Sequence, residues 1–122
     1  VAWESSDSLL LRLAEAEAAL QLPAAARHVQ VLTDRYAAAR ARGDTTHRAE
    51  EARFELHLRK DPVTAVALAR ANYAVQREPR DARVLLEAAL AANDPASAQS
   101  ARDWLRSSGF EDARMRQLGG MP

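Results

Sequence analysis

Apolar residues recur every three or four positions along most of this chain, which is the spacing of one face of an α-helix. The first such segment, residues 5–21, follows candidate N-caps at Ser5, Ser6 and Asp7 and has its apolar stripe at Leu9, Leu10, Leu13, Ala16 and Leu20. The second begins after Pro23 and has its apolar face at Val29, Leu32, Tyr36 and Ala39. Gly43 predicts the end of this helix, because glycine readily takes the left-handed conformation found just beyond helix ends.

Four further helices are predicted from the same spacing. Residues 47–60 carry apolar side chains at Ala49, Ala52, Phe54, Leu56 and Leu58. The helix that starts at Pro62 has its predicted buried stripe at Val63, Val66, Ala67, Ala71, Ala74 and Val75. Residues 81–92 bury Val84, Leu85, Ala88 and Ala89 in this interpretation. The last helix runs from Pro95 to Gly109 with Ala98, Ala101, Trp104 and Leu105 inside.

Three acid–proline pairs occur between residues 61 and 95: Asp61–Pro62, Glu78–Pro79 and Asp94–Pro95. Aspartate caps the first turn of a helix, and proline fits that turn because its missing N–H has no partner there. We expect the first and third pairs to start helices and Pro79 to end one, since the residue before a proline disfavours the helical conformation. The first and third pairs are 33 residues apart, a period typical of arrays of helical hairpins.

Residues 48–81 resemble a tetratricopeptide repeat (TPR), a 34-residue unit made of two antiparallel helices. Aligning the unit's terminal proline with Pro79 assigns the small positions of its second helix to Ala67 and Ala74. The large apolar positions of its first helix fall on Phe54 and Leu58. The segment departs from the family pattern at the position of the family's tryptophan, where Glu51 stands, and at a small-residue position, where Glu55 stands.

The resemblance implies an all-α fold, a right-handed α–α superhelix of about three TPR-like hairpins in a single domain that spans 1–122. The approximate repeats are 5–43, 44–79 and 80–109, followed by a tail at 110–122. The chain is also similar to alanine- and arginine-rich helical repeat proteins of bacteria. Because it begins at Val1 and not at Met, we expect it to be a piece of a longer protein.

Composition supports helices and narrows the possible functions. Alanine occupies 28 of the 122 positions and isoleucine none, which favours closely packed helices over a sheet. The 17 basic and 17 acidic residues cancel, which argues against a nucleic-acid-binding protein. No apolar run is long enough to predict membrane insertion, and the absence of cysteine is compatible with cytoplasm or periplasm.

Little in the sequence points to catalysis, so we expect no enzyme activity, no cofactor and no metal. His47 lies near Glu50 and Glu51, but a second histidine at metal-ligand spacing is missing. His28 and His57 have no nucleophile close to them in sequence.

The TPR resemblance implies a protein–protein interaction module whose first helices line a groove for a peptide or protein partner. The polar candidates for that groove are Arg53, His57, Lys60, Arg83 and Glu87. Basic groups there suit an acidic or C-terminal carboxylate peptide, although the same charges also suit a solvated helix face. An alternative is a structural domain that self-associates as part of a longer array, with Trp3 contributing to a homodimer.

Overall fold

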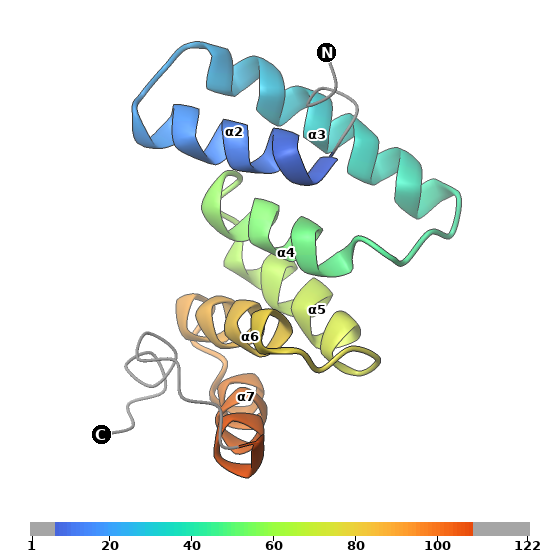
Figure 1. The fold of residues 1–122 in the computed structure, drawn as a ribbon, viewed down its shortest axis with the longest axis vertical. Helices are drawn as coiled ribbons and strands as arrows, with labels where there is room; N and C mark the ends of the chain where they lie inside the picture. Colours follow the sequence, from blue (N-terminus) through green and yellow to red (C-terminus); the bar gives the residue numbers. More distant parts are fainter. Residues whose placement is uncertain (1–6, 109–122) are drawn as a thin grey trace.

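The computed structural model describes residues 7–108, and within them the chain is entirely helical, with no strand. Six helices follow one another with short connections (Figure 1). Their bounds are α2 Asp7–Ala19, α3 Ala24–Ala41, α4 Arg48–His57, α5 Pro62–Tyr73, α6 Pro79–Ala91 and α7 Pro95–Ser108. The predicted all-α class is confirmed. The predicted caps Ser5 and Ser6, the predicted helix end at Gly109, Trp3 and the tail at 110–122 lie outside the described residues.

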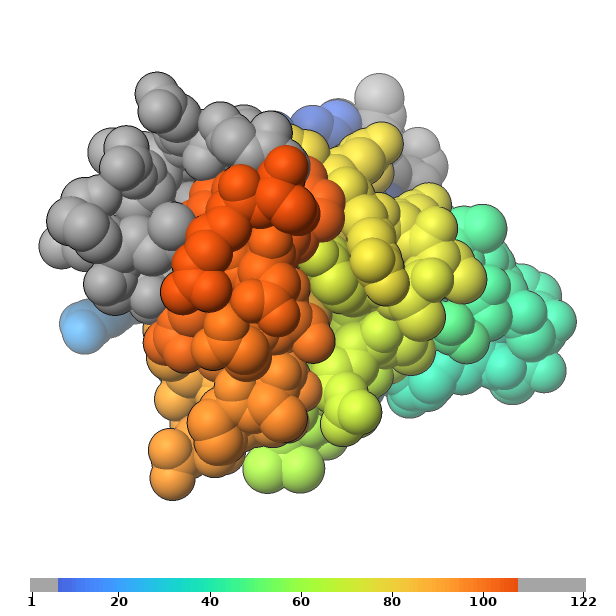
Figure 2. All heavy atoms as spheres, turned by 90° about the horizontal axis from the view of Figure 1, so that it is seen from below, coloured from blue at the N-terminus to red at the C-terminus, as the bar shows by residue number. Residues whose placement is uncertain are grey.

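Consecutive helices pack in pairs, and the pairs stack along the long axis of the molecule (Figure 1). We call the pairs α2–α3, α4–α5 and α6–α7 the first, second and third hairpins. The first helices of successive hairpins also touch, since α2 packs against α4 and α4 against α6. Seen from below in Figure 2, α7 lies at the near end of the stack.

The turn inside each hairpin contains one residue in the left-handed conformation. The residues Gln21, Lys60 and Asn93 follow the first helices and have left-handed φ angles of 57°, 56° and 56°. In each turn a proline stands two residues further on, at or just before the start of the second helix; these prolines are Pro23, Pro62 and Pro95. The left-handed residue follows the end of one helix and the proline favours the start of the next, so the three hairpin turns share this pair of residues.

Two of these turns are closed by the predicted aspartate caps. The Asp61 carboxylate accepts hydrogen bonds from the Thr64 N–H at 3.2 Å and from its hydroxyl at 2.6 Å. Asp94 accepts the equivalent pair from Ser97, at 3.2 and 2.8 Å. Because each cap satisfies a first-turn N–H that has no partner within the helix, these two acid–proline pairs start helices as predicted.

The prediction for Pro79 is wrong, because α5 ends at Tyr73 and Pro79 is the first residue of α6. The carboxylate of Asp81 holds the connection between α5 and α6 together by hydrogen bonds, and Asp81 is only 1% exposed. It accepts a hydrogen bond from the Asn72 side chain at 2.8 Å and another from the Glu78 N–H at 3.0 Å. Glu78–Pro79 therefore joins two hairpins, whereas the other two acid–proline pairs lie within a hairpin.

The predicted buried stripe of α5 is also wrong. Val63 and Val75 are 69% and 76% exposed, and the two alanines assigned to the TPR small positions, Ala67 and Ala74, are exposed as well. Only Val66 of the predicted stripe is fully buried. The helix instead buries Ala65, Val66, Ala69, Asn72 and Tyr73. Alanine at every second position from 65 to 71 leaves the apolar pattern without a clear phase, so packing against both α4 and α6 determines which side is buried.

The predicted phase of α2 is shifted in a similar way. Leu9 and Leu20 are 50% and 70% exposed, and α2 ends before Leu20. The residues that α2 buries are Leu10, Leu11, Ala14 and Glu17. The predicted face of α3 is confirmed, with Leu32, Tyr36 and Ala39 buried and Val29 half-buried.

The core consists of two clusters that meet at α4. Phe54 belongs to the cluster of the first hairpin, where its ring centroid lies 5.2 Å from that of Tyr36. Ala52 belongs to the cluster formed with α5, α6 and α7. Because α4 contributes to both clusters, it joins the first hairpin to the other two.

We predict that Lys60→Gly and Asn93→Gly each stabilise the fold by about 0.5–1 kcal/mol. A residue with a Cβ is strained at positive φ, and the relief outweighs the larger conformational entropy of glycine in the unfolded chain. Chemical denaturation measures the change in the free energy of unfolding. Ala38→Gly, at an exposed position inside α3, is the control and should cost about 1 kcal/mol. Equal losses at all three positions would contradict the shared turn geometry.

Candidate functional site

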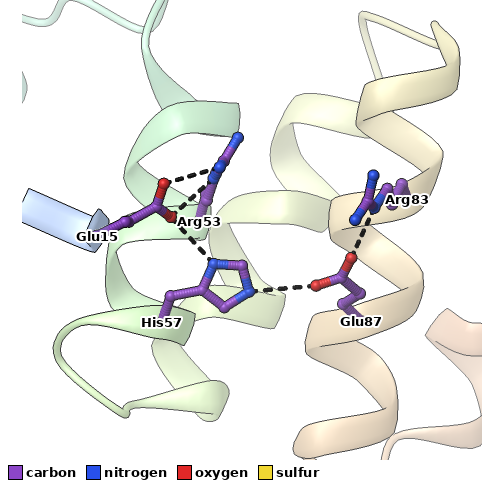
Figure 3. Close-up of polar contacts among 5 residues, drawn as sticks. All are labelled: Glu15, Arg53, His57, Arg83 and Glu87. Carbon is purple, nitrogen blue, oxygen red and sulfur yellow. Dashed lines mark hydrogen bonds and ion pairs between the residues drawn. The ribbon is translucent and has the colours of Figure 1, made fainter. Parts of the chain in front are cut away.

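Five charged side chains form a continuous polar network across the first helices of all three hairpins (Figure 3). Arg53 of α4 donates two hydrogen bonds to Glu15 of α2, at 2.8 and 2.7 Å. His57, one turn further along α4, contacts Glu15 through Nδ1 at 3.1 Å and Glu87 of α6 through Nε2 at 3.2 Å. Arg83 completes the chain by donating to Glu87 at 2.8 Å. We call these five residues the three-helix network.

The network favours the charged form of each of its titratable members. Hydrogen bonds from His57 to Glu15 and Glu87 raise the pKa of His57 to about 9, although burial acts the other way. The hydrogen bond from His57, together with Arg83, lowers the pKa of Glu87 to about 2. Burial raises the pKa of Glu15, but the hydrogen bonds from His57 and Arg53 outweigh it, and the net shift is downward. Since both ring nitrogens face carboxylates, His57 holds this position as an imidazolium that donates two hydrogen bonds.

Four of the five residues predicted from the sequence as groove candidates lie in this network: Arg53, His57, Arg83 and Glu87. The fifth, Lys60, is exposed in the turn after α4 and lies outside the network. Trp3 lies outside the described residues. The prediction missed Glu15, whose partners Arg53 and His57 are 38 and 42 residues away. No local pattern could have identified Glu15, because its role appears only when the hairpins stack.

The network limits the ability of the predicted basic residues to bind an acidic partner. The Arg53 and Arg83 guanidinium groups already contact carboxylates of this chain, and their side chains are about two-fifths exposed, at 42% and 37%. Ion pairs with this exposure contribute little to stability individually, but they satisfy the charges that an incoming acidic group would use. Arg53, His57, Arg83 and Glu87 therefore lie on one face without presenting a free positive patch.

A groove of about 210 Å³ lies beside the network, between the N-terminal parts of α2, α4 and α6. Arg53 is the one residue that belongs both to the three-helix network and to the lining of this groove. The groove is lined by Ser8, Leu11, Arg12, Thr46, Ala49, Glu50, Arg53, Gln76, Arg80 and Val84. A larger cleft of about 670 Å³ lies between the end of α3, the start of α4 and α5. Its lining combines apolar residues such as Val63 and Ala67 with charged ones such as Arg48 and Glu51.

The other two histidines lie in separate surroundings. His28 is buried between the helices of the first hairpin, where its Nδ1 lies 2.6 Å from a carboxylate oxygen of the buried Glu17. His47 lies 3.8 Å from Asp44 in the connection before α4. Across residues 7–108, no cluster of three or more potential metal ligands occurs. Over the same residues, no helix combines the length and the apolar character that a membrane span requires.

Comparison of the chain with protein-family models, with curated proteins and with solved structures gave no match.

We predict that the three-helix network stabilises the fold most between pH 4.5 and 6.5. The raised pKa of His57 gives stability that is complete below pH 6.5 and is lost as the pH rises through about 9. The lowered pKa of Glu87 gives stability that is present above pH 4.5 and is lost as the pH falls toward about 2. The Tm should therefore decrease from pH 6.5 to 9, and His57→Gln should remove most of that decrease.

Thermal unfolding followed by circular dichroism across this pH range measures the effect. His47→Gln is the matched control, since this ring has one carboxylate 3.8 Å away and lies outside the network. A wild-type protein and a His57→Gln variant whose Tm values change in parallel between pH 6.5 and 9 would contradict the assigned role of His57.

Proposed function

We propose that this chain is a non-enzymatic, TPR-like interaction module that holds a peptide or protein segment against the face formed by α2, α4 and α6. The observation that supports this most directly is the groove of about 210 Å³ lined by all three hairpins. A face assembled from several repeats presents side chains at regular positions, and extended or helical partner segments use such faces.

The geometry around the histidines favours binding over catalysis. His57 has a carboxylate at each ring nitrogen, and its raised pKa keeps it protonated near neutral pH, so it is a poor general base. His28 is 5% exposed and contacts the buried Glu17, which suits a structural role inside the first hairpin. These arrangements support a module whose polar residues position helices and contact a partner.

Blocking the groove should prevent capture of a partner segment. Ala49 is half-buried in the groove lining, so Ala49→Trp would fill part of the space without introducing charge. We predict that peptides selected on the wild-type protein from a random-peptide display library bind Ala49→Trp at least about tenfold more weakly, as measured by isothermal titration calorimetry.

Ala26→Trp is the control, because Ala26 is exposed on α3 and does not line the groove. Its affinity for the selected peptides should match that of the wild-type protein. Selected peptides that bind all three proteins equally well would remove the groove from the account, as would a selection that recovers no binding peptide.

A second candidate function is self-association, as expected of a structural domain within a longer array. It is favoured by the exposed apolar side of α5, where the 69%-exposed Val63 lines the 670 Å³ cleft beside α3. Contiguous apolar surface marks contact sites, and Val63, Ala67, Leu68 and Ala71 of α5 all line this cleft. In this case the second copy would cover α5.

Under this second function, the mass measured by light scattering rises with concentration, and Val63→Glu returns the protein to a monomer. Val75→Glu is the matched control, because Val75 is 76% exposed but does not line the cleft. A wild-type protein that remains monomeric at high concentration, or variants that behave alike, would exclude the cleft as the site of self-association.

A further inference from the structure

Two arginines on the groove remain open to an incoming anion. Arg12, on α2, is exposed and has no carboxylate partner among residues 7–108. Arg80, in the first turn of α6, lies 3.5 Å from the carboxylate of Glu78, and the two side chains are 74% and 67% exposed. Such an exposed pair contributes little and exchanges easily, so both guanidinium groups can bind another carboxylate.

The groove lining has two other charged groups, Arg53 and Glu50. Arg53 makes its two hydrogen bonds to Glu15. One oxygen of Glu50 accepts a hydrogen bond from the Ser8 hydroxyl at 2.7 Å, and its other oxygen is shielded from solvent. The lining therefore holds three arginines and the single carboxylate of Glu50, and its net charge is positive.

The lining of the groove also includes the apolar side chains of the half-buried Ala49 and Val84, with the core residue Leu11 beneath them at 2% exposure. Its volume of about 210 Å³ is below the range of roughly 300–1,000 Å³ that encloses a drug-sized molecule. The space therefore suits one or two side chains of a longer segment better than a whole small ligand.

We propose that the groove receives a short acidic peptide segment. An apolar side chain of the segment lies against Ala49 and Val84, and its flanking carboxylates pair with Arg12 and Arg80. This assignment rests on the proposed function and names the chemistry of the partner. It replaces the basic groups that the sequence suggested for binding acids, Arg53, His57, Lys60 and Arg83, with two arginines that belong to the first and third hairpins.

A defined probe tests the proposal: a fluorescein-labelled peptide that alternates glutamate and leucine, compared with otherwise identical peptides carrying glutamine or lysine. Fluorescence anisotropy should show the tightest binding for the glutamate peptide, and its affinity should fall as salt is added, because exposed ion pairs are screened. Arg12→Glu combined with Arg80→Glu should weaken binding of this peptide by about tenfold or more.

The control variant combines Arg42→Glu and Arg106→Glu, which changes the net charge equally at exposed arginines outside the groove lining. It should bind the glutamate peptide within about twofold of the wild-type protein, which corresponds to about 0.4 kcal/mol. An equal loss in both double variants would overturn the proposal, because it would reflect overall charge. Equal binding of all three peptides would also overturn it, as would stronger binding of a single-stranded oligonucleotide of the same charge.

These outcomes are distinguishable from failure of the proposed function. If Ala49→Trp abolishes capture of the library peptides while the Arg12→Glu, Arg80→Glu variant binds them normally, the groove binds peptides but does not select acidic ones. If Ala49→Trp has no effect on those peptides, the groove is not the binding site at all. Circular dichroism of each variant establishes that a loss of binding occurs in a folded protein.

Discussion

The arrangement of this protein depends on how the chain reverses within each hairpin. A residue with left-handed φ follows the first helix of each hairpin, at Gln21, Lys60 and Asn93, and a proline two residues later favours the start of the second. Because all three reversals share this form, each hairpin can stack on the next with its first helix on the same side. The packing of α2 on α4 and of α4 on α6 follows from that equivalence and creates a face to which every hairpin contributes.

Some charged side chains on that face pair with one another, and others remain accessible to a partner. His57 contacts Glu15 of the first hairpin and Glu87 of the third, so one side chain of the second hairpin links both of its neighbours. This pairing uses most of the positive charge that the sequence places on the face. Recognition of an acidic partner therefore depends on Arg12 and Arg80, whose guanidinium groups remain accessible on the groove.

The sequence predicted local features well and long-range ones poorly. The caps at Asp61 and Asp94 could be identified because each is defined within four residues. The buried side of α5 could not, because alternating alanines fit several helical phases and only contact with α4 and α6 distinguishes them. Pro79 was assigned to a helix end because proline disfavours helix before it, whereas the buried Asp81 carboxylate makes this proline a helix start. Four residues of the network could be proposed from their positions on predicted first helices. Their pairing with Glu15 depends on how the hairpins stack.

The central claim is that α2, α4 and α6 form one face, with His57 between Glu15 and Glu87. Cysteine pairs at these positions test it cleanly, since the chain has no cysteine of its own. Mass spectrometry after treatment with a short bifunctional thiol reagent should show efficient intramolecular cross-linking for Glu15→Cys with His57→Cys and for His57→Cys with Glu87→Cys. The pair Glu15→Cys with Glu87→Cys, which lies on opposite sides of His57, should cross-link poorly. Efficient cross-linking of that outer pair would contradict the stacked arrangement. Failure of both adjacent pairs to cross-link would contradict it as well.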